Sequence, residues 1–320
     1  MHFFIRIHPM FRQRLRYGLV GVAIMKMHSD GSDDKTILGI PQSSVIIEKA
    51  GFIAQVDYFR KVPIWVLEHY TNKTLGKAQG VSRKDVPFVK DEALPAIFQS
   101  TNRDYHKSGY SRGHMAAAAA HKQTQQHMND TFYLSNMVPQ DFENNKQYWA
   151  QFESWTRELI KNGFEEVWVL SGPCYMPYSF DQTHLKAITD GKSVNVANFD
   201  IQGPEKDVVT YQTIGKQRVA VPSHLYKVIV GKLPEDKQTA SSAFPDYMVA
   251  AFLIPNKPIP EHVPLTQFEV PLVFLEKFTG IHVFPKLDRN NLGLLCTTQI
   301  LINQKYQSLC SLKPSKYRNK

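Results

Sequence analysis

Apolar residues along this chain gather in short runs that predict the strands of a sheet. Strand-like runs, rich in β-branched and aromatic residues, lie at residues 64–69, 131–135, 166–171, 224–230 and 247–254. The third run should end at Gly172–Pro173, because glycine and proline interrupt regular structure. Residues 77–110 are polar with many breakers and predict a long surface loop, which in a compact domain is usually functional.

One long helix is predicted from about Asp141 to Asn162. Its apolar residues recur every three or four positions and should form a buried stripe: Tyr148, Phe152, Trp155 and Leu159. A second stripe recurs every four residues and mixes polar and aromatic groups: Asn145, Trp149, Glu153 and Arg157. In an isolated helix we would interpret this second stripe as a solvated face with a Glu153–Arg157 ion pair.

Two further segments near the C-terminus have helical character. Residues 266–284 predict a short helix that ends near Gly280, followed by a strand, and residues 291–311 predict one amphipathic helix. Strands and helices alternate irregularly along the whole chain. This order favours an α+β fold over a regular βαβ array.

The two ends of the chain differ in composition from its middle. Residues 1–28 are rich in arginine and precede the first acidic residue, Asp30, which is typical of a mitochondrial presequence. A short membrane-interfacial or signal-anchor segment and a disordered basic arm are the alternatives; the apolar run 17–25 is too short to span a bilayer comfortably. We therefore divide the chain into residues 1–36 as targeting or anchor segment and linker, 37–286 as the main domain, and 287–320 as a short helical appendage with a basic tail.

Composition narrows the class of protein. Apolar residues make up 42% and charged residues 21%, as in soluble globular proteins. The 38 lysines and arginines exceed the 29 acidic residues, giving a net charge of +9 that would attract a polyanion such as nucleic acid. The three cysteines are widely spaced, and none of them forms a CxxC motif. We therefore expect reduced thiols rather than a disulfide framework or a thiolate zinc site. HExxH, GxSxG and glycine-rich phosphate-loop motifs are absent from the sequence.

The chemistry-bearing stretch lies at residues 108–157. His114 has the side chain whose ordinary pKa lets it accept a proton from water near neutral pH. Gly113, directly before it, lets another group approach the backbone closely. Taken alone, these two residues are weak evidence for catalysis, because a single histidine is more often structural than catalytic.

Three motif elements in order make the stretch specific. They are Ser111-Arg112-Gly113-His114, then Asn136-Met137-Val138-Pro139-Gln140, then Asn145. Together they resemble the signature of the sugar-nonspecific ββα-metal (His-Me finger) nucleases, and most of all its endonuclease G branch. Ser111 replaces the aspartate of most members, and with the run NMVPQDFENN it resembles the mitochondrial exo/endonuclease G-like subfamily. The resemblance extends from about Val62 through Pro285.

The resemblance implies a role for each matching residue. It implies that His114 is the general base, with Arg112, Glu153 and Asn136 as further catalytic residues, and that Asn145 binds Mg²⁺, for which Mn²⁺ can substitute. It also implies that Arg83, Arg157 and Ser111 contact the substrate. The implied fold is a central antiparallel sheet that carries the ββα-metal motif. If His114 is the base, the rate should rise with pH through roughly 6–7.5.

The implied activity is hydrolysis of phosphodiester bonds in DNA, with RNA as a further candidate, to 5′-phosphate and 3′-hydroxyl products. The resemblance also implies 5′–3′ exonuclease beside endonuclease activity, a mitochondrial homodimer, and association with the inner membrane through the N-terminal segment. Family relatives carry a longer helical wing after the nuclease core, so functions of that wing are not implied here. A catalytically silent nucleic-acid-binding relative is the main alternative, but an inactive descendant would usually have lost one of the site residues, and all are present: His114, Asn145, Asn136, Glu153 and Arg157. An extracellular scavenging nuclease is disfavoured by the acid-free N-terminus.

Overall fold

The computed structural model describes residues 38–189, 206–234 and 245–296. Contacts divide the chain between Gln42 and Ser43, and the unit that begins at Ser43 contains every helix and strand discussed below. The predicted targeting segment, 1–36, lies outside the described residues. Within the described part, no helix is long and apolar enough to cross a membrane.

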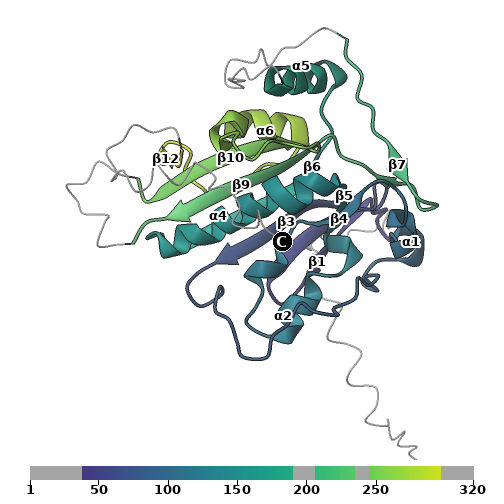
Figure 1. Ribbon diagram of the computed structural model, residues 1–320, viewed down its shortest axis with the longest axis horizontal. Helices are drawn as coiled ribbons and strands as arrows, with labels where there is room; N and C mark the ends of the chain where they lie inside the picture. The colour runs from purple at the N-terminus through teal and green to yellow at the C-terminus, as the bar shows by residue number, and fades with distance from the viewer. Residues whose placement is uncertain (1–37, 190–205, 235–244, 297–320) are drawn as a thin grey trace, which may run out of the picture. The chain divides into compact units, whose positions relative to one another are not determined.

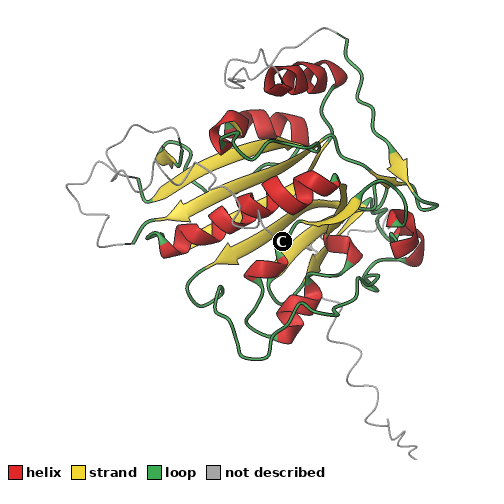
Figure 2. Cartoon of the chain, viewed as in Figure 1, coloured by secondary structure: helices red, strands yellow, loops and turns green. Residues whose placement is uncertain are grey.

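A large antiparallel sheet forms the centre of this unit (Figure 1, Figure 2). Its strands, in spatial order, are β1 (Ser44–Glu48), β2 (Phe52–Asp57), β3 (Pro63–Tyr70), β6 (Glu166–Cys174), β9 (His224–Lys232), β10 (Tyr247–Pro255) and β11 (Glu269–Val270). The short strand β12 (Leu292–Leu294) joins β10 in parallel. The predicted α+β class and central antiparallel sheet are therefore confirmed.

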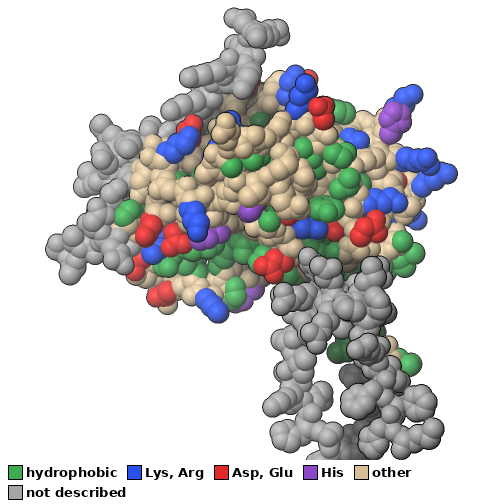
Figure 3. Space-filling model, turned by 90° about the horizontal axis from the view of Figure 1, so that it is seen from below, with side chains coloured by type: hydrophobic (Ala, Val, Ile, Leu, Met, Phe, Trp, Pro, Cys, Tyr) green, Lys and Arg blue, Asp and Glu red, His purple; other side chains and the backbone are tan. Residues whose placement is uncertain are grey.

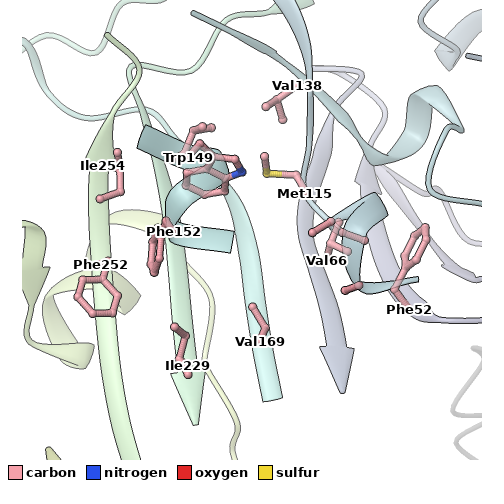
Figure 4. Packing of buried hydrophobic residues seen from close by; sticks show 14 of the residues in the cluster. Phe52, Val66, Met115, Val138, Trp149, Phe152, Val169, Ile229, Phe252 and Ile254 are labelled. Atoms are coloured by element: carbon pink, nitrogen blue, oxygen red, sulfur yellow. The ribbon is translucent and has the colours of Figure 1, made fainter. Parts of the chain in front are cut away.

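The central strands are buried on both faces, which explains their nearly continuous apolar sequences. Alternate residues of β9 and β10 face two separate cores. One core packs against α4 (Ala150–Lys161), and Figure 4 shows Trp149 and Phe152 lying between the strands that carry Ile229 and Phe252 and the segment that carries Met115 and Val138. The other core packs against α5 (Tyr178–Thr189) and α6 (Leu272–Thr279).

A β-hairpin and the helix that follows it form a second layer over the first core. Strand β4 (Ser111–His114) pairs antiparallel with β5 (Met137–Gln140), outside the large sheet. The chain then enters α3 (Phe142–Asn144), the π-helical turn η5 (Asn145–Trp149) and α4. This order, strand, strand, helix, is the ββα arrangement that the motif predicted.

Short elements fill the connections. They are the 3-10 helices η2 (Ala96–Phe98), η3 (Ala118–Ala120), η4 (Leu134–Asn136) and η8 (Leu265–Phe268), the helices α1 (Asn102–Tyr105) and α2 (Gln125–Asp130), and the paired strands β7 (Thr213–Ile214) and β8 (Val219–Ala220). The predicted long loop at 77–110 contains η2 and α1 and is otherwise irregular. On the face shown in Figure 3, basic, acidic and hydrophobic side chains are interspersed, so the net positive charge is not concentrated there.

Most predicted elements are confirmed, and several boundaries differ. The strands at 64–69, 166–171, 224–230 and 247–254 and the helix after Asp141 are present. Strand β6 continues through Gly172 to Cys174. Glycine is needed at position 172 because a side chain there would collide with the hydroxyl of Tyr226, which donates a hydrogen bond to the Ile64 carbonyl (2.9 Å). The helix at 272–279 ends at Gly280, whose φ of +69° suits glycine.

Other predictions are wrong. Residues 131–135 form no strand beyond an isolated bridge between Tyr133 and Val89. The amides of residues 131–133 bond three residues back, as Phe132 does to Asn129, and the segment continues into η4. The strand expected after Gly280 is an irregular segment braced by Arg289, which donates to the Val283 carbonyl (2.6 Å). The helix expected at 291–311 is contradicted at its start by β12, and residues 297–320 lie outside the described part. Strands β1 and β2 were not predicted.

The cysteines partly contradict the expectation of reduced thiols. Cys174 is a buried free thiol at the end of β6, and burial raises its pKa to about 12. Cys296 is disulfide-bonded.

Candidate active site

The β4–β5 hairpin places the motif residues through close backbone packing. Gly113 lies opposite Val138, and a Cβ on Gly113 would sit 2.1 Å from Gln140 Oε1. The glycine of the motif is therefore required because the Gln140 side chain lies against its backbone. His114, directly after this contact, ends the strand and pairs with Met137.

His114 is held in an aromatic environment that keeps it neutral. Its ring packs edge-on against Phe132 (5.0 Å between centroids) and at a tilt against Phe88 (5.6 Å). Burial, with smaller contributions from the charge of Arg83 and from His121, lowers the pKa of His114 to about 3. Its Nε2 atom is buried and has no hydrogen-bond partner among the described residues. The imidazole is thus in the form that can accept a proton.

The long loop at 77–110 contributes to the same environment. The Arg83 guanidinium lies 5.6 Å from the centroid of the Phe132 ring that packs against His114. Arg112, two residues before His114 in β4, lies 4.7 Å from the Phe88 centroid and donates from Nε to Asn102 Oδ1 (2.9 Å). Arg112 is therefore anchored to the loop through its guanidinium, while Arg83 adds positive charge near His114.

Asn145, the expected metal ligand, is oriented by the hairpin. Its Nδ2 donates to Ser111 Oγ (2.9 Å), and Ser111 Oγ donates in turn to the Gln140 carbonyl (2.8 Å). The side-chain oxygen of Asn145 accepts no hydrogen bond from the residues that the structure describes. Ser111, which is expected to contact substrate, also contacts the metal-ligand candidate.

Amide side chains fasten the beginning of the helix to the large sheet. Asn144 accepts from Gln140 Nε2 (2.8 Å) and donates to the carbonyls of Pro255 (3.1 Å) and Lys257 (2.9 Å). Asn256 accepts from the Asp141 amide (2.9 Å). The π-helical turn that begins at Asn145 is thereby fixed relative to the end of β10, and such turns are frequent at functional sites.

Asn136 has a supporting position in the structure. It is fully buried, and its amide bonds both the N–H (2.8 Å) and the carbonyl (3.1 Å) of Ala116 and also the Thr131 carbonyl (2.8 Å). These bonds use both donor hydrogens and engage the acceptor oxygen. Asn136 thus holds the segment that follows His114.

Glu153 and Arg157 lie on the helix as the second stripe predicts. Burial raises the pKa of Glu153 to about 7, against the opposing charges of Lys227, Arg157 and Arg83. The ion pairs of the described residues do not include one between Glu153 and Arg157. Arg157 Nη1 is buried and is without a hydrogen-bond partner among the described residues. The interpretation as a solvated ion pair is therefore wrong.

Two buried charged residues beneath the helix were missed by sequence analysis. Lys227 of β9 is 1% exposed, donates to Ser171 Oγ (2.6 Å) and lies 4.8 Å from the Trp149 ring centroid. Glu68 of β3 is fully buried and accepts from Tyr70 Oη (2.9 Å), with His121 Nε2 2.8 Å away. The sequence could have indicated both residues, because each is a charged residue within an otherwise apolar strand. His121 is therefore a buried histidine held against the carboxylate of Glu68.

The donor set suits a hard divalent cation bound through few protein ligands. No group of three or more histidine, cysteine or acidic side chains among the described residues could hold a metal ion. Asn145 offers an unengaged amide oxygen, and the carboxylate of Glu153 makes no hydrogen bond to a described residue. Magnesium characteristically binds through one or two oxygen ligands, keeps several waters and uses substrate phosphate for the rest. The residues present therefore fit Mg²⁺ better than a thiolate- or imidazole-bound metal.

Comparison with known proteins connects this geometry to a family. A family model described as DNA/RNA non-specific endonuclease matches residues 33–290. The mitochondrial nuclease EXOG of Homo sapiens is 38% identical over 274 residues, which cover 84% of this chain and 66% of the human protein. The mitochondrial nuclease of Saccharomyces cerevisiae is 41% identical over 236 residues, covering 73% of this chain and 64% of the yeast protein.

A solved structure agrees with these relatives. EndoG in the crystal structure titled for the EndoG/EndoGI complex and the mechanism of EndoG inhibition is similar at 33% identity and a TM-score of 0.65, covering 81% of this chain and 93% of that one. This chain spans about two thirds (66%) of the length of the human relative. The matched residues include both strands of the hairpin, the helix after it and the central sheet, so the chain belongs to the DNA/RNA non-specific endonuclease family.

Proposed function

We propose that this protein is a Mg²⁺-dependent nuclease that hydrolyses phosphodiester bonds of DNA, and also of RNA, to 5′-phosphate and 3′-hydroxyl products. The family is one of metal-dependent nucleases that act on nucleic acid. The observation that carries the proposal is His114: a buried, neutral imidazole with an unpartnered Nε2, placed by a ββα hairpin whose helix begins at Asn145.

Each residue then has a chemical task. His114 takes a proton from the attacking water, because its lowered pKa keeps it deprotonated at physiological pH. Arg83 and Arg157 bind and orient phosphate oxygens through their guanidinium groups. Asn145 would hold Mg²⁺, Glu153 would orient the waters of the ion, and the ion would stabilise negative charge on the phosphoryl group and the leaving oxygen. Arg112 and Asn136 keep the hairpin in place around His114.

We extend the proposal to the cell on separate grounds. The names of the human and yeast relatives place those proteins in mitochondria, and the first 28 residues of this chain have the composition of a presequence. We therefore propose a mitochondrial location, with the same segment as the point of any contact with the inner membrane. The homodimer and the combination of 5′–3′ exonuclease with endonuclease activity remain part of the proposal through family resemblance.

A catalytically silent nucleic-acid-binding protein is the alternative. It would retain the positive charge and the fold and would lose one of the groups that act on water or metal. Instead, His114, Asn145, Glu153 and Arg157 are all present, and His114 is neutral with a free nitrogen. The positions of these groups therefore favour the enzyme.

The direct test uses purified full chain with end-labelled single- and double-stranded DNA and with RNA. Hydrolysis should occur with Mg²⁺ or Mn²⁺, stop with EDTA, and leave ends that ligase joins without prior phosphorylation. Linear and covalently closed circular substrates separate exonuclease from endonuclease cutting. Binding to these substrates without hydrolysis in either metal would instead support the silent relative.

A further inference from the structure

Ser111 lies at the centre of a short chain of hydrogen bonds that ends at the metal-ligand candidate. Its hydroxyl donates to the Gln140 carbonyl (2.8 Å) and accepts from Asn145 Nδ2 (2.9 Å). The two residues that it joins belong to different elements, β5 and the π-helical turn η5. Ser111 is therefore the link between the hairpin and the first residue of that turn.

The hydrogen-bonding capacity of each group determines which one donates and which one accepts in this series of hydrogen bonds. A hydroxyl can donate one hydrogen bond, and Ser111 donates it to a carbonyl oxygen, which can only accept. Its remaining lone pairs can therefore interact with Asn145 only through the NH₂ group of the amide. The amide oxygen, which is the atom that a hard cation binds, must then point away from Ser111. Without the hydroxyl, the amide could rotate by half a turn and present nitrogen instead of oxygen.

The Gln140 carbonyl, which accepts the hydrogen bond from Ser111, is itself held in place by further hydrogen bonds. Ser111 and Gln140 are partners in the β4–β5 register, and the Gln140 side chain donates to Asn144 Oδ1 (2.8 Å). Asn144 in turn donates to the carbonyls of Pro255 and Lys257 at the end of β10. The orientation of Asn145 is thus tied through Ser111 to the large sheet.

We propose that Ser111 is a positioning residue for the metal site, which sets the orientation of the Asn145 amide so that its oxygen faces the cation. This inference rests on the proposed function of Asn145 as metal ligand. It replaces the expected role of Ser111 as a substrate contact, since both hydrogen bonds of its hydroxyl are made within the protein. Ser111 acts on metal affinity through Asn145 and need not touch nucleic acid.

The test measures metal binding directly, without turnover. Mn²⁺ binding to full-length protein, followed by the paramagnetic resonance signal of the free ion, is compared for wild type, Ser111→Ala, Ser111→Thr and Asn145→Ala. Ser111→Ala should weaken Mn²⁺ binding about 5- to 10-fold, the usual effect of one hydrogen bond. Ser111→Thr keeps the hydroxyl and suits a strand, so it should bind within about twofold of wild type. Thermal unfolding identifies any variant that fails to fold.

The double variant separates this role from a general effect on structure. In an Asn145→Ala background, Ser111→Ala should cause no further loss of Mn²⁺ binding, because the group that it positions is gone. Wild-type Mn²⁺ binding by Ser111→Ala, or an equal loss in both backgrounds, would overturn the inference and leave Asn145 as a ligand. Wild-type binding by Asn145→Ala would instead show that the proposed metal site is wrong. If Ser111→Ala does not fold, failure of Ser111→Thr to bind Mn²⁺ despite folding would equally overturn the inference.

Discussion

Glu153 should control the pH dependence of hydrolysis, and the substitution Glu153→Gln tests this. Burial raises the pKa of Glu153 to about 7, whereas His114 has a pKa lowered to about 3 and is neutral throughout the physiological range. If the carboxylate form is the active one, about 9% of the enzyme is active at pH 6 and about 91% at pH 8, by ordinary titration of a single group. The rate should therefore rise about tenfold between these pH values.

The rise resembles the one expected from imidazole deprotonation at pH 6–7.5, but the structure assigns it to a different residue. Glu153→Gln should lower activity at pH 8 and abolish most of the rise, because the amide does not titrate. The assay is single-turnover cleavage at saturating Mg²⁺ from pH 5.5 to 8.5. An unchanged rise in Glu153→Gln would refute the assignment, and a wild-type rate that is flat over this range would show that Glu153 does not titrate there in the metal-loaded enzyme.

A stability measurement supplies an independent control for the same variant. A carboxyl whose pKa is raised by folding stays uncharged more readily in the folded state, so stability is lost as pH rises from about 4.5 to about 7. Glu153→Gln removes this loss and should raise the free energy of unfolding at pH 8 by at most about 3 kcal/mol. Equal stability of the two proteins at pH 5 and pH 8 would show that burial does not perturb Glu153.

Three further substitutions test the site. Gly113→Ala should lower the free energy of unfolding by about 2–4 kcal/mol in urea titrations, because the new methyl meets Gln140 Oε1 at 2.1 Å; adding Gln140→Ala should recover part of the loss, and an additive loss would contradict the collision. Asn145→Ala should raise the Mg²⁺ needed for half-maximal rate and lower the maximal rate by at least about a hundredfold, as a Mg²⁺ titration would show. Arg157→Ala should weaken DNA binding and reduce the slope of log affinity against log salt by about 1, and an unchanged slope would remove Arg157 from the phosphate contacts.

The elements that sequence analysis predicts are those with a strong pattern of burial. Strands β6, β9 and β10 are covered on both faces and have long apolar runs, and the helix stripe at Tyr148 and Phe152 packs into the core as its spacing requires. Strands β1 and β2 were missed because apolar residues such as Ile46 and Ile53 occupy exposed positions in the edge strand and its neighbour, which hides the alternation in the sequence. The run at 131–135 is apolar enough for a strand, but it makes only an isolated bridge to Val89, and most of its amides bond within turns.

The candidate site also has features that the sequence predicts and features that only the structure shows. Motif spacing identifies His114 and Asn145, since the order of residue types along the chain carries that information. The environment of each residue depends on contacts between distant segments, such as Arg83 near His114 or Lys227 near Glu153. The local sequence does not indicate which distant segments come into contact. For this reason the low pKa of His114 and the contact between Ser111 and Asn145 required the structure.

The central claim is that His114 is the base in a nuclease, and His114→Ala tests it most directly. DNA affinity, measured in EDTA by fluorescence anisotropy, should stay within about twofold of wild type, because phosphate contacts come from other residues. Single-turnover cleavage in Mg²⁺ should be abolished, while the matched control His282→Ala, at an exposed loop residue, should cleave normally. Cleavage by His114→Ala at the wild-type rate would contradict the account.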